Sequence, residues 1–143
     1  MAAVAQTAFE YLTDQIDRLP ATDDPAADLI AIGTRVIRRL ALDHPGLFRI
    51  AFQRVAGLRA DPGLVAARQL AWVQLQDAVQ RLDEAGLLGT KPVPDAAREI
   101  NAMWEGLANA ELRGEVLRIM PRGDEERAWV DALTTVVRGF AAT

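Results

Sequence analysis

Few side chains in this sequence could carry catalysis. His44 is the only histidine, and the chain contains neither cysteine nor serine. A single histidine cannot build a His-His metal site or a Glu-x-x-His pair, and the commonest nucleophiles are missing. The threonines remain, without a histidine base near them in the sequence. We therefore expect no catalytic residues, no metal, no cofactor and no enzyme activity, and we interpret His44 as structural.

One carboxylate differs from the rest, which mostly flank helix starts or lie on polar faces. Glu111 continues an apolar stripe that includes Trp104 and Leu107, and this position predicts partial burial. A partly buried carboxylate can act as an acid or base, contact a ligand, or pair with an arginine such as Arg113 or Arg81. All three roles stay open at this point, and an ion pair is the one that we expect.

Length and composition place the chain in a broad class. With 143 residues, half of them hydrophobic, it has the size of one ordinary domain and can bury a single core. The net charge of -4 has the wrong sign for neutralising a phosphate backbone, so we expect no direct binding to nucleic acid. No window is apolar over the roughly 18 residues that a membrane span needs. We expect a cytoplasmic protein.

Hydrophobic periodicity and breaker residues predict an all-α bundle of about six helices and no strand. The expected helices cover about 3–19, 23 or 24 to 43, 47–58, 62–85 and 95–112, followed by a last one that carries Trp129 to Phe140. Asp-Pro pairs mark two of the starts, because Asp can cap free backbone N–H groups and Pro fits the first turn. Asp95 is expected to cap the helix over 95–112.

Two further patterns concern the arrangement of these helices. The segment 70–73 (Leu-Ala-Trp-Val) is apolar all round, which predicts that the helix over 62–85 is the central one. Arg35, Arg38 and Arg39 cluster on the second helix, and we interpret them as a solvated face rather than as a phosphate-binding patch.

Small residues recur four apart on the fifth expected helix, and three or four apart on the sixth. Gly106 and Gly139 each lie inside such a ridge, and glycine inside a helix costs about 1 kcal/mol relative to alanine. Close packing would offset that cost, because small side chains let helix axes approach. The ridges fit either packing within the chain or a seam with a second subunit. They comprise Ala102, Gly106, Ala110 and Gly114 on one helix, and Ala128, Ala132, Thr135 and Gly139 on the other.

Three segments together resemble the C-terminal part of Tet-repressor-family regulators. They are residues 43–48 (Asp-His-Pro-Gly-Leu-Phe) followed by Phe52, residues 84–88 (Glu-Ala-Gly-Leu-Leu), and residues 104–114, which begin Trp-Glu-Gly. The third looks like the Trp-His-Gly motif of one C-terminal subfamily, with Glu105 at the histidine position. Each motif is short, and their order and spacing carry the resemblance.

The resemblance implies a two-part regulator, in which an N-terminal helix-turn-helix binds DNA and a C-terminal body binds an effector and dimerises. We expect residues 1–143 to be that body, with the helix-turn-helix absent and DNA contacted only through such a head. The implied protein is a homodimeric transcriptional regulator, a repressor, with a small apolar or aromatic ligand in an internal pocket. The alternative is a helical interaction or adaptor domain without a small-molecule pocket.

The resemblance also suggests where the sites lie. A pocket between the first helix, the central helix and the helix over 95–112 would be lined by Phe9, Leu12, Phe48, Phe52, Trp72, Gln76, Val79, Met103 and Leu107, with Gln76 as the polar contact. Aromatic residues and methionine at helical spacing are, residue by residue, more often ordinary core. The expected dimer interface comprises Ala102, Gly106, Ala110, Trp129, Leu133, Val136, Val137 and Phe140.

Overall fold

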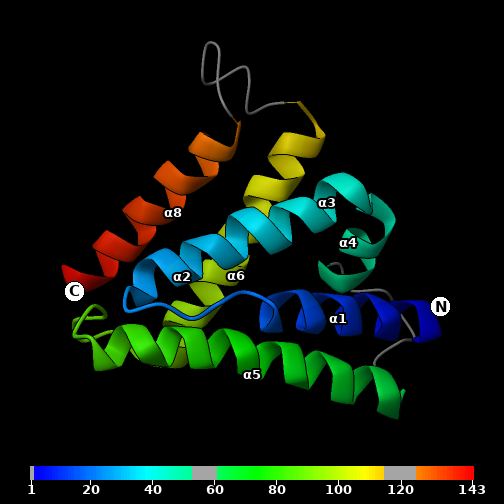
Figure 1. Ribbon diagram of the computed structural model, residues 1–143, viewed down its shortest axis with the longest axis horizontal. Helices are drawn as coiled ribbons and strands as arrows, with labels where there is room; N and C mark the ends of the chain where they lie inside the picture. Colours follow the sequence, from blue (N-terminus) through cyan, green and yellow to red (C-terminus); the bar gives the residue numbers. More distant parts are fainter. Residues whose placement is uncertain (1, 53–60, 115–124) are drawn as a thin grey trace.

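The computed structural model describes residues 2–52, 61–114 and 125–143, and within these ranges every regular element is a helix (Figure 1). The all-α prediction is confirmed. The elements are α1 (Ala2–Asp17), α2 (Pro25–Ala31), the π-helical η1 (Ile32–Ile37), α3 (Arg38–Asp43), α4 (Pro45–Phe52), α5 (Pro62–Glu84), α6 (Val93–Leu112) and α8 (Glu125–Ala141). Because α2, η1 and α3 follow one another without a break, the described ranges contain the six helical stretches that were expected. The predicted extension of the third helix to residue 58 lies outside the described residues.

Local capping chemistry explains where two of the helices begin. The Asp24 carboxylate accepts a hydrogen bond from the backbone N–H of Ala27 at 3.0 Å, and Asp61 does the same for Leu64 at 2.9 Å. Each caps a helix whose first residue is proline, as predicted. The prediction for Asp95 was wrong: α6 begins two residues earlier, after Pro92, and Asp95 lies in its first turn, where it pairs with Arg98.

The central element is the α2–η1–α3 stretch and not α5. It contacts α1, α4, α5, α6 and α8, and most of its apolar side chains are buried (Figure 1). The helix α5 lies along one side of the bundle, beside α1, with Leu70 58% and Val73 40% exposed. Only one side of α5, which includes Leu75 and Val79, faces the core. An apolar run of four residues therefore did not indicate an enclosed helix.

A π-helical turn interrupts the central stretch. The backbone N–H of Arg38 bonds to the carbonyl of Gly33, five residues earlier, where an α-helix would bond four residues back. Such single π turns occur frequently at functional sites. Here the turn lies where η1 meets α6 and α8, and it determines how the side chains on either side of it are rotated.

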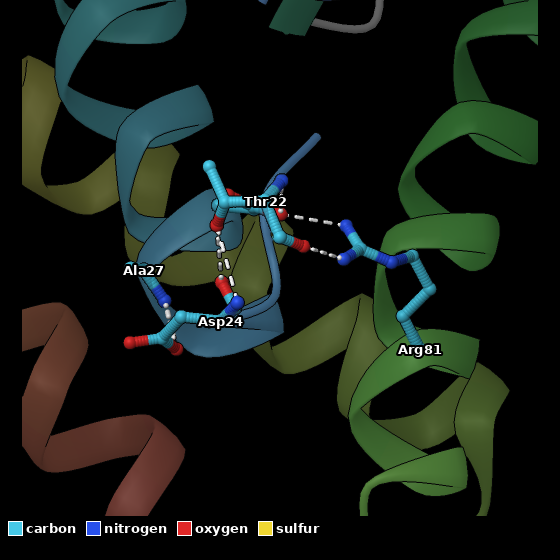
Figure 2. Close-up of polar contacts among 5 residues, drawn as sticks. Thr22, Asp24, Ala27 and Arg81 are labelled. Atoms are coloured by element: carbon cyan, nitrogen blue, oxygen red, sulfur yellow. Dashed lines mark hydrogen bonds and ion pairs between the residues drawn. The ribbon is translucent and has the colours of Figure 1, made fainter. Parts of the chain in front are cut away.

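Arg81 of α5 anchors the loop that precedes α2 (Figure 2). Its guanidinium donates to the carbonyl of Thr22 at 2.6 Å and to the Asp28 carboxylate at 2.7 Å. Asp28 also accepts from the hydroxyl and the backbone N–H of Thr22. Burial raises the pKa of Asp28, but these hydrogen bonds and the charge of Arg81 outweigh it and hold the pKa below its ordinary value of 3.8.

Candidate ligand-binding cavity

A cavity of about 200 Å³ lies in the bundle between α1, the central stretch, α4, α5 and α6. For scale, an engineered apolar cavity of about 150 Å³ binds benzene. By the same proportion, the space suits an apolar body of roughly eight non-hydrogen atoms. It is lined by Phe9, Leu12, Ile16, Ile37, Ala51, Phe52, Arg68, Ala71, Trp72, Leu75, Asn101 and Trp104.

Aromatic rings make up much of the cavity wall. Phe9, Phe52, Trp72 and Trp104 come from four different helices. Phe52 is held from behind by Phe48, whose ring stacks on it with centroids 4.9 Å apart. A largely apolar, concave wall of this kind is typical of small-molecule sites.

Two polar side chains interrupt the apolar wall. Arg68 extends from α5 with its guanidinium carbon 5.8 Å from the centroid of the Phe9 ring. Asn101 comes from α6. Within the part of the chain that the structure describes, neither side chain has a hydrogen-bond or ion-pair partner. The wall therefore contains one cation and one amide that are free to meet a ligand.

Four of the predicted ligand contacts line this cavity: Phe9, Leu12, Phe52 and Trp72. Phe48 and Val79 are fully buried core residues outside the lining, and Gln76, Met103 and Leu107 are half-buried and also outside it. Binding of a ligand by any of them stays a prediction. The two polar groups in the wall are Arg68 and Asn101, where Gln76 had been expected. Helical periodicity could have marked Arg68, whose neighbours three and four positions away are all apolar, but it could not mark Asn101, which has Arg98 and Glu105 among those neighbours.

Glu111 forms a buried ion pair that ties three elements together. Its carboxylate accepts from the Nε and a terminal nitrogen of Arg38, the shortest contact being 2.7 Å, and from the indole N–H of Trp129 at 2.8 Å. The side chains of Glu111 and Arg38 are only 9% and 14% exposed. The hydrogen bond from Arg38 to Glu111 raises the pKa of Arg38 above its ordinary value.

This contact confirms that Glu111 is partly buried and ion-paired, and it corrects the partner. Arg38 had been assigned to a solvated face, and Arg81, one of the two expected partners, binds Asp28. Arg38 and Glu111 are 73 positions apart in the sequence. No helical spacing rule relates residues at that distance.

Gly33 allows η1, α6 and α8 to meet closely. A Cβ atom at this position would lie 2.7 Å from Nε1 of Trp104 and 2.6 Å from a methyl carbon of Leu133. Trp104 is buried, and its indole N–H has no hydrogen-bond partner within the described ranges. The same indole lines the cavity, so the cavity wall and the junction of the three elements share one side chain.

The residues predicted for a dimer interface fall into two groups. Trp129, Leu133, Val137 and Phe140 are buried by this chain's own helices. Ala102 and Gly106 are exposed on α6, while Ala110 and Val136 are half-buried. A second copy could thus cover the exposed side of α6, but it cannot reach the four buried residues while the bundle is folded.

Other kinds of site find no support within the described residues. These hold no group of three or more His, Cys, Asp or Glu side chains suited to a metal ion. His44 packs its ring edge-on against Tyr11, with centroids 5.5 Å apart. No described helix is both long enough and apolar enough to cross a membrane.

Comparison with known proteins decides the family. The model of the tetracyclin repressor-like C-terminal domain matches residues 29–137, most of the chain. The chain belongs to this family. Domains of this family generally serve regulators as effector-binding and dimerisation domains.

No curated protein matches the chain. A solved structure of a protein with unknown function from Rhodococcus sp. RHA1 superposes with a TM-score of 0.83 and 21% sequence identity, covering 98% of this chain and 71% of that one. At this identity, the likeness shows the shared fold.

Proposed function

We propose that this tetracyclin repressor-like domain binds a small, largely apolar effector in the cavity between α1, α4, α5 and α6. The observation that carries the proposal is the cavity itself, bordered by Trp72 and Trp104 and large enough for a compact organic molecule. Packing at the η1 junction connects Trp104 to Gly33 and Leu133. An effector that shifts the Trp104 indole would therefore act on the position of α8 as well.

Ligand binding can be tested with the protein's own tryptophans. Compounds that occupy the cavity should change tryptophan fluorescence and raise the melting temperature, because any ligand that prefers the native state stabilises it. Trp72→Ala should weaken both responses, whereas Val73→Ala, on the exposed side of α5, should leave them unchanged. Two results would count against the cavity as an effector site. One is an equal response in wild type and Trp72→Ala. The other is no change in fluorescence or melting temperature across a broad panel of hydrophobic compounds, both neutral and charged.

The domain also acts as a homodimer, with the exposed side of α6 and the neighbouring side of α8 as the seam. A Cβ on Gly106 or Gly139 would meet no other atom of the described residues within 4 Å, so packing among these residues does not account for either glycine. Each costs about 1 kcal/mol inside a helix, which a close contact with a second copy would offset. Glu105, which precedes Gly106 in the segment that resembles the Trp-His-Gly subfamily motif, would lie beside this seam.

As a repressor, the protein would bind DNA through a helix-turn-helix head and not through the surface of this domain. The chain's net charge of -4 opposes contact with phosphates. A gel-shift titration of this chain against the region upstream of its own gene should show nonspecific background only. Saturable, sequence-dependent binding at physiological salt would overturn this part of the proposal.

A further inference from the structure

We propose that the effector carries a carboxylate, which binds Arg68 while the apolar body of the molecule fills the cavity. This inference rests on the proposed ligand-binding function and names the chemical class of the ligand. It follows from a cation in an otherwise apolar wall that has no anionic partner among the described residues.

Arg68 has no acidic residue within reach on its own helix. On a helix, an arginine finds acidic partners three or four positions away. Those positions around Arg68 hold Leu64, Val65, Ala71 and Trp72. Other arginines are paired: Arg39 with a carboxylate four positions away, and Arg38 and Arg81 with carboxylates on other helices.

The position of Arg68 suits a carboxylate at the edge of an apolar site. The side chain is exposed at residue level, yet it lines the cavity and its guanidinium lies near the Phe9 ring. A long side chain can place its methylene stem along apolar surface while its charged end stays near water. An amphipathic acid with its body between the rings of Trp72 and Phe52 could thus present its charge to Arg68 without burying an unpaired anion.

Asn101 provides an internal comparison. Its carboxamide is neutral and can hydrogen-bond to an acid or to an amide. Arg68 distinguishes between the two, because its guanidinium can form an ion pair with two parallel hydrogen bonds to a carboxylate but has no opposite charge to meet in an amide. The ratio of acid affinity to amide affinity therefore reports on Arg68 in particular.

The test uses two acids of suitable size, 3-phenylpropionate and octanoate, and their uncharged amides, each titrated against the chain by calorimetry. We expect both acids to bind more tightly than their amides. Arg68→Met, which keeps an apolar stem, should reduce acid affinity by about tenfold and leave amide affinity nearly unchanged. Arg68→Lys should restore part of the preference. Two variants should preserve the preference: Asn101→Ala, which changes both affinities alike, and Arg35→Met, which removes an exposed arginine outside the cavity lining.

The outcomes separate this inference from the proposed function. If amides bind as tightly as acids in wild type, or if Arg68→Met keeps the preference, the carboxylate assignment is wrong and the cavity remains an effector site. If none of the four compounds binds, and neutral aromatic compounds do not perturb tryptophan fluorescence either, both proposals fall.

Discussion

The indole nitrogen of Trp104 lies so close to Gly33 that a Cβ atom there would be only 2.7 Å from it. Trp104 belongs to α6 and Gly33 to η1, so the glycine determines how closely these helices approach. The same indole borders the cavity. A change at Gly33 would therefore disturb both the core and the cavity wall.

Gly33→Val should lower the free energy of unfolding by about 2 kcal/mol or more, because overpacking forces rigid neighbours to move. Urea denaturation monitored by circular dichroism measures the loss. The matched control is Gly46→Val, where nothing lies within 4 Å of the added Cβ and the change should stay within about 0.5 kcal/mol. Equal free energies of unfolding for the two variants would show that Leu133 and Trp104 can move away from the added side chain without destabilising the protein.

Glu111→Gln should destabilise the protein by about 3 kcal/mol, since it leaves the Arg38 guanidinium with an incomplete partner in a buried place. The control is Asp43→Asn, which breaks the exposed ion pair with Arg39, whose side chains are 54% and 45% exposed. Exposed pairs of this kind contribute about 0–1 kcal/mol. Thermal and urea unfolding should thus separate the two variants, and a similar loss in both would mean that burial does not strengthen the Arg38–Glu111 pair.

Asp28 should make stability depend on pH in the acid range. Because its pKa is lower in the folded protein than the ordinary 3.8, its contribution is present above that value and is lost as the pH falls through the folded pKa. Asp28→Asn should lower stability near neutral pH and flatten the acid limb of the profile. The exposed Asp23 serves as a control, and Asp23→Asn should reproduce the wild-type profile. An acid limb unchanged by Asp28→Asn would assign the pH dependence to other groups.

Ala102→Arg should convert the dimer to a folded monomer. In a symmetric seam, one substitution enters twice, and burying two unpaired charges costs several kcal/mol. Sedimentation at micromolar concentration measures the change, and circular dichroism checks folding. Ala66→Arg, on the exposed side of α5, should leave the dimer intact. A wild-type chain that sediments as a monomer at every concentration would contradict the seam.

Local sequence signals predicted the helices well, but they could not predict most contacts between residues that are far apart in the sequence. Asp24 and Asp61 were identified as helix starts because a cap depends on residues only three positions away. The partner of Glu111 could not be predicted in the same way, since it depends on how α3 packs against α6.

The residues that line the cavity were likewise predicted only in part. Three of the four aromatic residues of its wall, Phe9, Phe52 and Trp72, were predicted from apolar periodicity and the family resemblance. Arg68 and Asn101 were not, because a polar residue beside an apolar stripe usually faces water and only the packing shows which ones border a cavity. The middle of α5 shows the opposite error: its apolar run predicted burial, but Leu70 and Val73 are exposed to solvent.

The π-helical turn at Ile32–Ile37 behaves as a one-residue insertion in an otherwise regular helix. Because a π turn takes up one residue more than an α turn, deleting one residue within it would let the segment close as regular α-helix and leave the residues on either side nearly in their original register. Arg38 would then remain opposite Glu111, whereas a one-residue deletion within the regular α-helix of α2 would turn every later residue by about 100° relative to the start of that helix. A single-codon deletion of the exposed Arg35 should therefore be milder than one within α2, and homologous sequences should differ in length by one residue more readily in this segment than elsewhere in the central stretch.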